Sequence, residues 1–79
     1  MLNVDTLLMD IDSSSTGLLE ITIPRELLDS KENGQDVPFN ALDNTIDAAF
    51  IPAEVKTTNQ SRTLSIPFNN ETIFIMIMS

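Results

Sequence analysis

The chain of 79 residues has twelve acidic and four basic residues, a net charge of −8, and neither cysteine nor histidine. This acidity opposes binding to nucleic acid or anionic membranes, because both need a cationic patch. Without cysteine and histidine, disulfides, thiolate metal sites and the commonest general base are excluded. We expect one small domain over residues 1–79. Because disulfides and thiolate metal sites are excluded as aids to stability, such a domain could still bury more surface by oligomerisation.

The first part of the chain predicts two strands and a turn between them. Apolar side chains recur at every second position over residues 4–12 and again over Leu18–Ile23. This period of two is typical of half-buried strands. The turn-forming residues from Asp12 to Gly17 predict that the two strands form a hairpin.

Pro24 marks the end of the second strand, because proline offers no backbone donor to a neighbouring strand. Proline also suits the first position of a helix, and Arg25–Leu28 are good helix formers, so we expect one short helical turn here. The polar stretch Asp29–Asp36 is predicted to be a loop with its tight turn at Asn33-Gly34.

The rest of the chain repeats short strands and turn signals. Hairpin turns are predicted at Asp43-Asn44, where both residues tolerate positive φ, and at Asn69–Glu71, with another turn at Thr58–Ser61. This spacing favours an antiparallel β-sandwich or open barrel. We expect an all-β fold, a small immunoglobulin-like or jelly-roll-like β-sandwich with one helical turn. The remaining predicted strands are Val37–Leu42, Thr45–Ile51, an edge segment at Ala53–Thr57, Arg62–Phe68 and Thr72–Met78.

The inward faces of these strands, together with the helical turn, predict the hydrophobic core. Its expected members are Leu7, Met9, Ile11, Leu19, Ile21, Ile23, Leu27, Phe39, Ile46, Phe50, Leu64, Ile66, Phe68, Ile73, Ile75 and Ile77.

Three stretches occur in a familiar order: Gly17–Asp29, the predicted hairpin Phe39–Ile46, and Ser61–Phe68. Together with the isoleucines of the last strand, they resemble a β-domain that is repeated in surface and secreted proteins of ammonia-oxidising archaea. The resemblance covers most of the chain from about Leu8 onward, and the run Ile23-Pro24-Arg25-Glu26-Leu27-Leu28-Asp29 is its most specific part. It implies a marine archaeal origin and a cell-surface or extracellular location, but no activity and no site residues.

The chain departs from the resembled family in two places. The central hairpin has Asp43-Asn44 where the family usually has Asp-Gly. The last strand has Phe74, Met76 and Met78 where the family usually has acidic residues, and it ends at Ser79 without a sorting tail. The chain is therefore expected to be a free-standing copy of the domain with a last strand that is apolar on both faces.

Asp10 and Asp12 open a stretch that begins like a calcium-binding loop, with oxygen ligands at alternate positions. The pattern then fails, because Ser15 occupies the place of the sharp-turn glycine and Ile21 that of the bidentate glutamate. A polar hairpin turn is the better interpretation. No specific metal site, no cofactor and no catalytic residue is expected.

The last strand is the candidate site of self-association. Ile73, Ile75 and Ile77 form one face, while Phe74, Met76 and Met78 form the other. A half-buried antiparallel strand normally has a polar face, so the second apolar face needs a cover. We expect a twofold homodimer that packs this face, with Leu8 or Leu18, against a second copy. The alternative is a cover within the monomer, by the helical turn or the loop Asp29–Asp36.

Two classes of function remain open. The first is a non-enzymatic structural or interaction module of a cell-surface or extracellular protein. The second is a β-sandwich that binds a small ligand or carbohydrate. Carbohydrate sites usually present exposed aromatic rings, and this chain has four phenylalanines but no tryptophan or tyrosine, which favours the first class.

Overall fold

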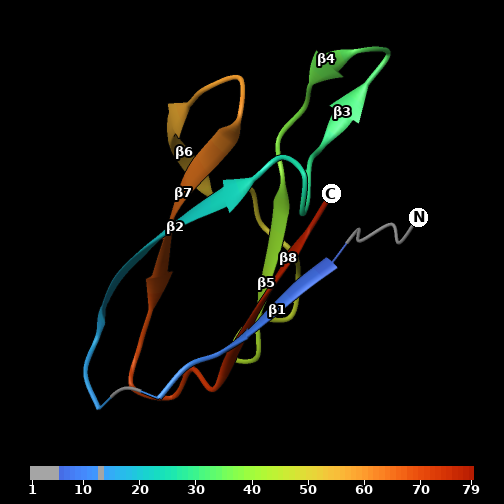
Figure 1. Cartoon of the computed structure of the whole chain (residues 1–79). Coiled ribbons are helices and arrows are strands. Elements are labelled where there is room, and N and C mark those ends of the chain that lie inside the picture. The colour runs from blue at the N-terminus through green and yellow to red at the C-terminus, as the bar shows by residue number, and fades with distance from the viewer. Residues whose placement is uncertain (1–5, 13) are drawn as a thin grey trace.

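The computed structural model describes residues 6–12 and 14–79. This part of the chain is all-β and contains no helix, and its strands form three antiparallel sheets (Figure 1). Two sheets of three strands, in the orders β1-β8-β5 and β2-β7-β6, form the layers of a small β-sandwich, as predicted, and β3 and β4 form a separate hairpin. The strands are β1 (Thr6–Asp10), β2 (Gly17–Pro24), β3 (Lys31–Glu32), β4 (Gln35–Asp36), β5 (Asn40–Asp43), β6 (Ala53–Thr57), β7 (Ser61–Phe68) and β8 (Phe74–Met78).

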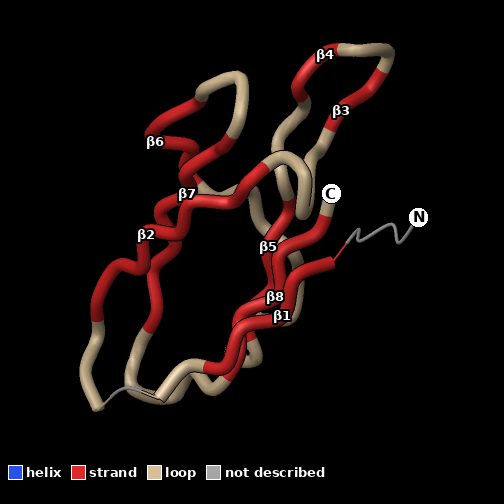
Figure 2. The backbone as a smooth tube through the Cα atoms, in the orientation of Figure 1, coloured by secondary structure: helices blue, strands red, loops and turns tan. Residues whose placement is uncertain are grey.

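The sandwich is built from one long antiparallel ribbon that bends at a corner. β1 pairs with β8 from Thr6 opposite Met78 to Asp10 opposite Phe74, and β2 pairs with β7 over their whole length. The arm of residues 6–24 therefore runs beside the arm of residues 61–78. Both arms pass from one sheet to the other at the same end of the molecule (Figure 2). The Ile11 amide donates to the Ile73 carbonyl (2.9 Å), which carries the pairing into the corner.

The predicted hairpin between the first two strands is wrong, because β1 and β2 belong to different sheets. The predicted hairpin at Asn69–Glu71 is wrong for the same reason, since it joins β7 to β8. Residues 14–17 and 69–73 form the two chains of the corner instead, while Ser13 lies outside the described residues. Turn-forming residues show where a chain changes direction, but not which strand it meets afterwards.

The third strand of each sheet comes from the middle of the chain. β5 pairs with β8. β6 pairs with β7, which confirms the predicted edge segment Ala53–Thr57 and the turn at Thr58–Ser61 between these two strands. The predicted strand Thr45–Ile51 is wrong: it meets β5 only where Phe50 and Ala41 exchange two backbone hydrogen bonds (2.7 and 2.8 Å).

The turn after β5 explains why residues 45–51 do not form the predicted strand. The Asp43 carboxylate accepts hydrogen bonds from both the amide and the hydroxyl of Thr45 (2.7 Å each), which makes an Asx-turn. In the described residues, positive φ angles occur at Asn33 (53°) and Gly34 (78°). Asp43 and Asn44 therefore do not form the two-residue hairpin turn that the sequence predicted, because that turn needs positive φ. Asn33-Gly34, by contrast, is the predicted tight turn, since two consecutive positive φ angles match a type I′ hairpin between β3 and β4.

The predicted helical turn after Pro24 is a single hydrogen-bonded turn. The amides of Leu27 and Leu28 both donate to the Pro24 carbonyl (2.9 and 3.2 Å), and the chain then leaves the helical path. This turn places Leu28 in the core at 1% exposed and leaves Leu27 45% exposed, so the prediction of Leu27 as a core residue is wrong.

The core lies between the two sheets and follows the predicted inward faces closely. Ile46 and Ile73, both predicted inside, are exposed. Ile46 follows the Asx-turn, and Ile73 lies in the corner before β8 begins, so strand alternation does not extend to either residue. The buried apolar cluster is Ile23, Leu28, Phe39, Leu64, Ile66, Ile75 and Ile77, with Leu7, Met9, Ile11, Leu19, Ile21, Phe50 and Phe68 packed against it.

Candidate functional site

Arg62 occupies an inward position of β7, in phase with the core residues Leu64 and Ile66, and its side chain is 2% exposed. Its guanidinium group donates to the Glu54 carboxylate (2.7 and 3.0 Å) and to Asp29 (3.1 Å). It also donates to the backbone carbonyls of residues 30 and 37 (2.9 Å each). All these contacts satisfy a buried charge, so the cluster is structural.

Arg25 extends this cluster toward the small hairpin. It donates to both oxygens of Asp36 (2.7 and 2.9 Å), to Asp29 (3.1 and 3.2 Å) and to the Thr58 carbonyl (3.0 Å). Burial raises the pKa of the Asp29 carboxyl, but the hydrogen bonds from Arg25, Arg62 and a backbone amide lower it below its ordinary value. The hydrogen bond from Arg25 is also the main cause that lowers the pKa of Asp36 to about 2.

These contacts give each part of the run Ile23–Asp29 a structural role. Ile23 and Leu28 lie in the core, Pro24 supplies the carbonyl that closes the turn, and Arg25 and Asp29 are members of the ionic cluster. In this chain the motif therefore holds the end of β2 against the hairpin β3-β4 and the start of β7.

The outer face of sheet β1-β8-β5 has an apolar centre, with the exposed polar residues Thr6, Asp10 and Asn40 at its ends. In β8, Ile75 and Ile77 point into the core, so Phe74, Met76 and Met78 lie on the outer side and are half-buried. The register places Leu8 and Leu42 on either side of Met76, and Leu8 is 57% exposed. Together these five residues form what we call the apolar face: Leu8, Leu42, Phe74, Met76 and Met78.

The outer face of the other sheet is different in character. Beyond Leu18, which is exposed at the end of β2, it presents polar residues of β2 and β7. Thr22 and Thr63, for example, form a cross-strand pair through their hydroxyls (2.9 Å). Leu18 thus lies on the opposite layer from Phe74, Met76 and Met78, while Leu8 lies directly beside them.

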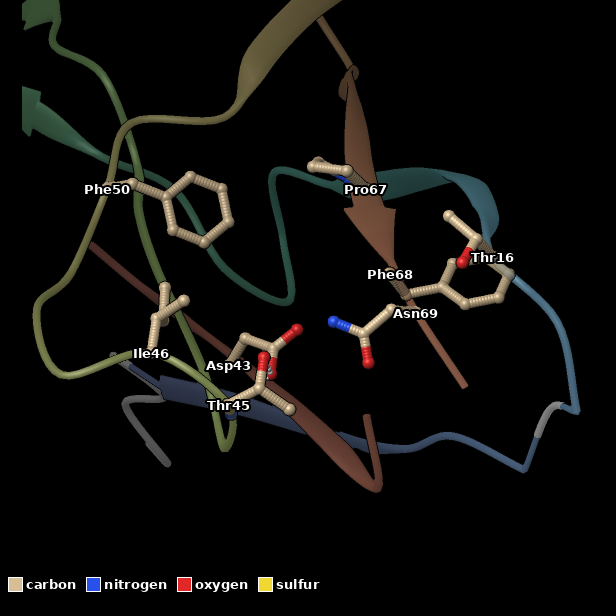
Figure 3. Close-up of a pocket in the computed structure, with 8 residues that line it drawn as sticks. All are labelled: Thr16, Asp43, Thr45, Ile46, Phe50, Pro67, Phe68 and Asn69. Carbon is tan, nitrogen blue, oxygen red and sulfur yellow. Dashed lines mark hydrogen bonds between the residues drawn. The ribbon is translucent and has the colours of Figure 1, made fainter. Parts of the chain in front are cut away.

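A pocket of about 470 Å³ opens beside the turn that follows β5. Its apolar walls come from Phe50 and Ile46 on one side and from Phe68 and Pro67 on the other (Figure 3). Gly17 lies opposite Phe68 in the β2–β7 ladder, and a Cβ there would be 2.9 Å from the Phe68 ring, so glycine makes room for this wall. The polar lining consists of Thr16, Asp43, Thr45 and Asn69.

The two residues of the abandoned calcium interpretation lie apart from this pocket. Asp10 is exposed at the end of β1, where it faces Phe74 of β8, and Asp12 is exposed in the corner. Within the described ranges, no group of three or more acidic residues is placed to hold a metal ion. The same part of the chain contains no helix long and apolar enough to cross a membrane.

Sequence reasoning placed the apolar residues of β8 on one face, but it missed both the ionic cluster and the pocket. Arg62 carried a signal, because a charged residue at an inward position of an alternating strand needs a buried partner. The pocket carried no such signal, since residues from four separate stretches line it.

Comparisons with protein-family models, curated proteins and solved structures gave no match to this chain.

Proposed function

We propose that the protein is a non-enzymatic interaction module that self-associates through the apolar face. The observation that carries this proposal is the contrast between the two outer faces of the sandwich. One face has five apolar side chains across three strands, whereas β2 and β7 of the other sheet present Glu20, Thr22, Thr63 and Ser65 beside the exposed Leu18. Large exposed apolar patches mark interaction surfaces.

Within residues 6–12 and 14–79, the two segments expected to cover this face from within the monomer lie elsewhere. The alternative cover, the loop Asp29–Asp36, is held elsewhere by Arg25 and Arg62. Leu28 of the preceding turn is buried in the core on the inner side of the sandwich. We therefore expect solvent or another molecule to meet the apolar face.

A second copy is the occupant that suits this surface best. Two copies that each carry a charge of −8 repel each other wherever their acidic surfaces meet. The centre of the apolar face, formed by Leu8, Met76 and Leu42, is free of charge and lets like-charged copies approach. Added salt should therefore strengthen the dimer, whereas it would weaken binding to a basic partner.

The size of the face sets the expected strength. Two strands of five residues and one of four cover at most about 14 by 17 Å at ordinary strand spacing. A standard interface buries about 800 Å² per partner, which is more than this face provides. We therefore expect a weak dimer whose population depends on concentration.

We infer the location only from the resemblance that residues 17–29 suggest to a domain of archaeal surface and secreted proteins. We propose that the module belongs to a cell-surface or extracellular protein.

The test uses Phe74→Glu with Met76→Lys, which places two charges on the apolar face. The matched control, Leu18→Glu with Ser65→Lys, places the same charges on the outer face of the other sheet. By light scattering at about 100 μM, where micromolar affinities are visible, wild type and control should be dimers and the first variant a folded monomer. A soluble wild-type monomer, or a dimer that survives both changes on the apolar face, would contradict the proposal.

A further inference from the structure

The pocket beside β5 contains a buried carboxylate without a cationic partner. Asp43 is 5% exposed and accepts hydrogen bonds from Thr45 and from the Thr72 hydroxyl (2.9 Å). In residues 6–12 and 14–79, the ion pairs join Arg25 and Arg62 to other carboxylates, and none includes Asp43. Burial raises the pKa of Asp43, but these hydrogen bonds lower it below its ordinary value, so the group is charged at neutral pH.

The walls around this carboxylate suit a cation with an apolar body. The rings of Phe50 and Phe68 lie on either side of the pocket (Figure 3). Aromatic rings attract cations within about 6 Å of their centres, and most strongly where water is excluded. No lysine or arginine lines the pocket, and the charge of −8 raises the local concentration of cations around the whole molecule.

The polar groups narrow the choice of cation. Asp43 already accepts three hydrogen bonds, so it offers charge more than free acceptor sites. This favours a methylated ammonium, which needs no hydrogen bond, over a primary one. The Asn69 side-chain oxygen accepts from the Glu71 amide (2.7 Å), which leaves its NH₂ group, directed toward Asp43 in Figure 3, to donate to an oxygen of the ligand.

We propose that this pocket binds a small methylated ammonium compound that also carries an oxygen atom, the chemical class of choline. A calcium ion is a poorer candidate, because it takes six to eight oxygen ligands and Asp43 is the one carboxylate of the lining. The proposal is independent of self-association, since the pocket lies beside the turn after β5 and the apolar face lies on the outer side of the sheet.

The experiment compares choline with 3,3-dimethylbutan-1-ol, which has the same shape but no charge. Amide NMR titrations at constant ionic strength should show saturable shifts at Thr45, Phe50 and Phe68 with choline. The neutral alcohol should bind about twofold to thirtyfold more weakly, as cation–π energies of about 0.5–2 kcal/mol imply. Ethanolamine, the primary ammonium, should also bind more weakly. No saturable binding of choline, or equal binding of the alcohol, would overturn the proposal.

Three variants test whether the preference for choline over the neutral alcohol arises in this pocket. Asp43→Asn should remove the preference for choline over the alcohol, while Asp47→Asn, the same charge change at an exposed loop residue, should leave it intact. Because Asp43 also holds its turn together, Phe50→Leu serves as a second test. It should weaken choline binding severalfold and change alcohol binding little. A loss of preference in Asp47→Asn, or an equal effect of Phe50→Leu on both compounds, would show that the pocket does not recognise the charge.

Discussion

The guanidinium carbon of Arg62 lies 4.4 Å from the centre of the Phe39 ring. Both side chains are buried, and Arg62 stands opposite Ile23 in the β2–β7 ladder, where a core residue would normally be. The position is tolerated because Asp29 and Glu54 supply opposite charges. The core of this small domain is therefore closed at one end by an ionic cluster rather than by apolar side chains.

Replacement of Arg62 tests the structural role of this cluster. Arg62→Met should lower the free energy of unfolding by about 1–3 kcal/mol, because it leaves the partly buried carboxylates of Asp29 and Glu54 and the carbonyls of residues 30 and 37 without their donor. Lys56→Met, at an exposed position of β6, removes the same charge and should change stability by less than about 1 kcal/mol. Urea unfolding followed by circular dichroism measures both. Similar losses in the two variants would mean that the cluster adds nothing beyond net charge.

Acid should destabilise the fold through the same cluster. The pKa of Asp36 is lowered to about 2 from an ordinary value of 3.8. The pKa of Asp29 is lowered by Arg25 and Arg62, and that of Glu54 by Arg62 and Thr57. A lowered folded-state pKa stabilises the protein above the ordinary pKa, and this stability is lost as the pH falls through the folded-state value. Stability should therefore decline from about pH 4 toward pH 2.

One variant assigns part of this decline. Asp36→Asn removes a carboxylate of the cluster and should flatten the dependence of unfolding free energy on pH in that window. Asp47→Asn makes the same charge change in the loop after β5, away from the cluster, and serves as the control. Urea midpoints measured at pH steps from 2 to 6 make the comparison. Equal slopes in wild type and Asp36→Asn would rule out Asp36 as a source of the pH dependence.

Two adjacent leucines test the phase of the turn after Pro24. Leu28→Ala should destabilise the protein by about 2–5 kcal/mol, because Leu28 is fully buried. Leu27→Ala makes the same chemical change one residue earlier at an exposed position and should cost less than about 1 kcal/mol. Thermal unfolding of the two variants measures both losses of stability. A larger loss for Leu27→Ala than for Leu28→Ala would show that the turn places Leu27 inward.

The alternation of side chains predicted most of the core because it depends only on which residues within one strand share a face. Ile75, Ile77, Leu64 and Ile66 are all buried as expected. Alternation failed where the strand had ended or had not begun, as at Ile73 in the corner. It also failed at Ile46, where the Asp43 carboxylate competes with a hairpin for the Thr45 amide.

Strand pairing could not be predicted in the same way. Asp12–Gly17 is rich in residues that form hairpin turns, yet the partner of β1 is β8, more than sixty positions later. Such pairing depends on contacts between distant strands, which no local pattern encodes. The pocket has the same property, since Phe50, which is bridged to β5, and Phe68 of β7 line it from different layers of the sandwich.

Self-association through the apolar face is tested most directly by the methionine methyl groups. The chain has four methionines, of which Met76 and Met78 lie on the apolar face and Met9 points into the core as an internal reference. Carbon-13 methyl spectra should be recorded on dilution from about 1 mM to about 10 μM, a range that spans weak affinities. We expect the Met76 and Met78 signals to shift with concentration while the Met9 signal stays fixed. Concentration-independent signals from all three residues would contradict the account.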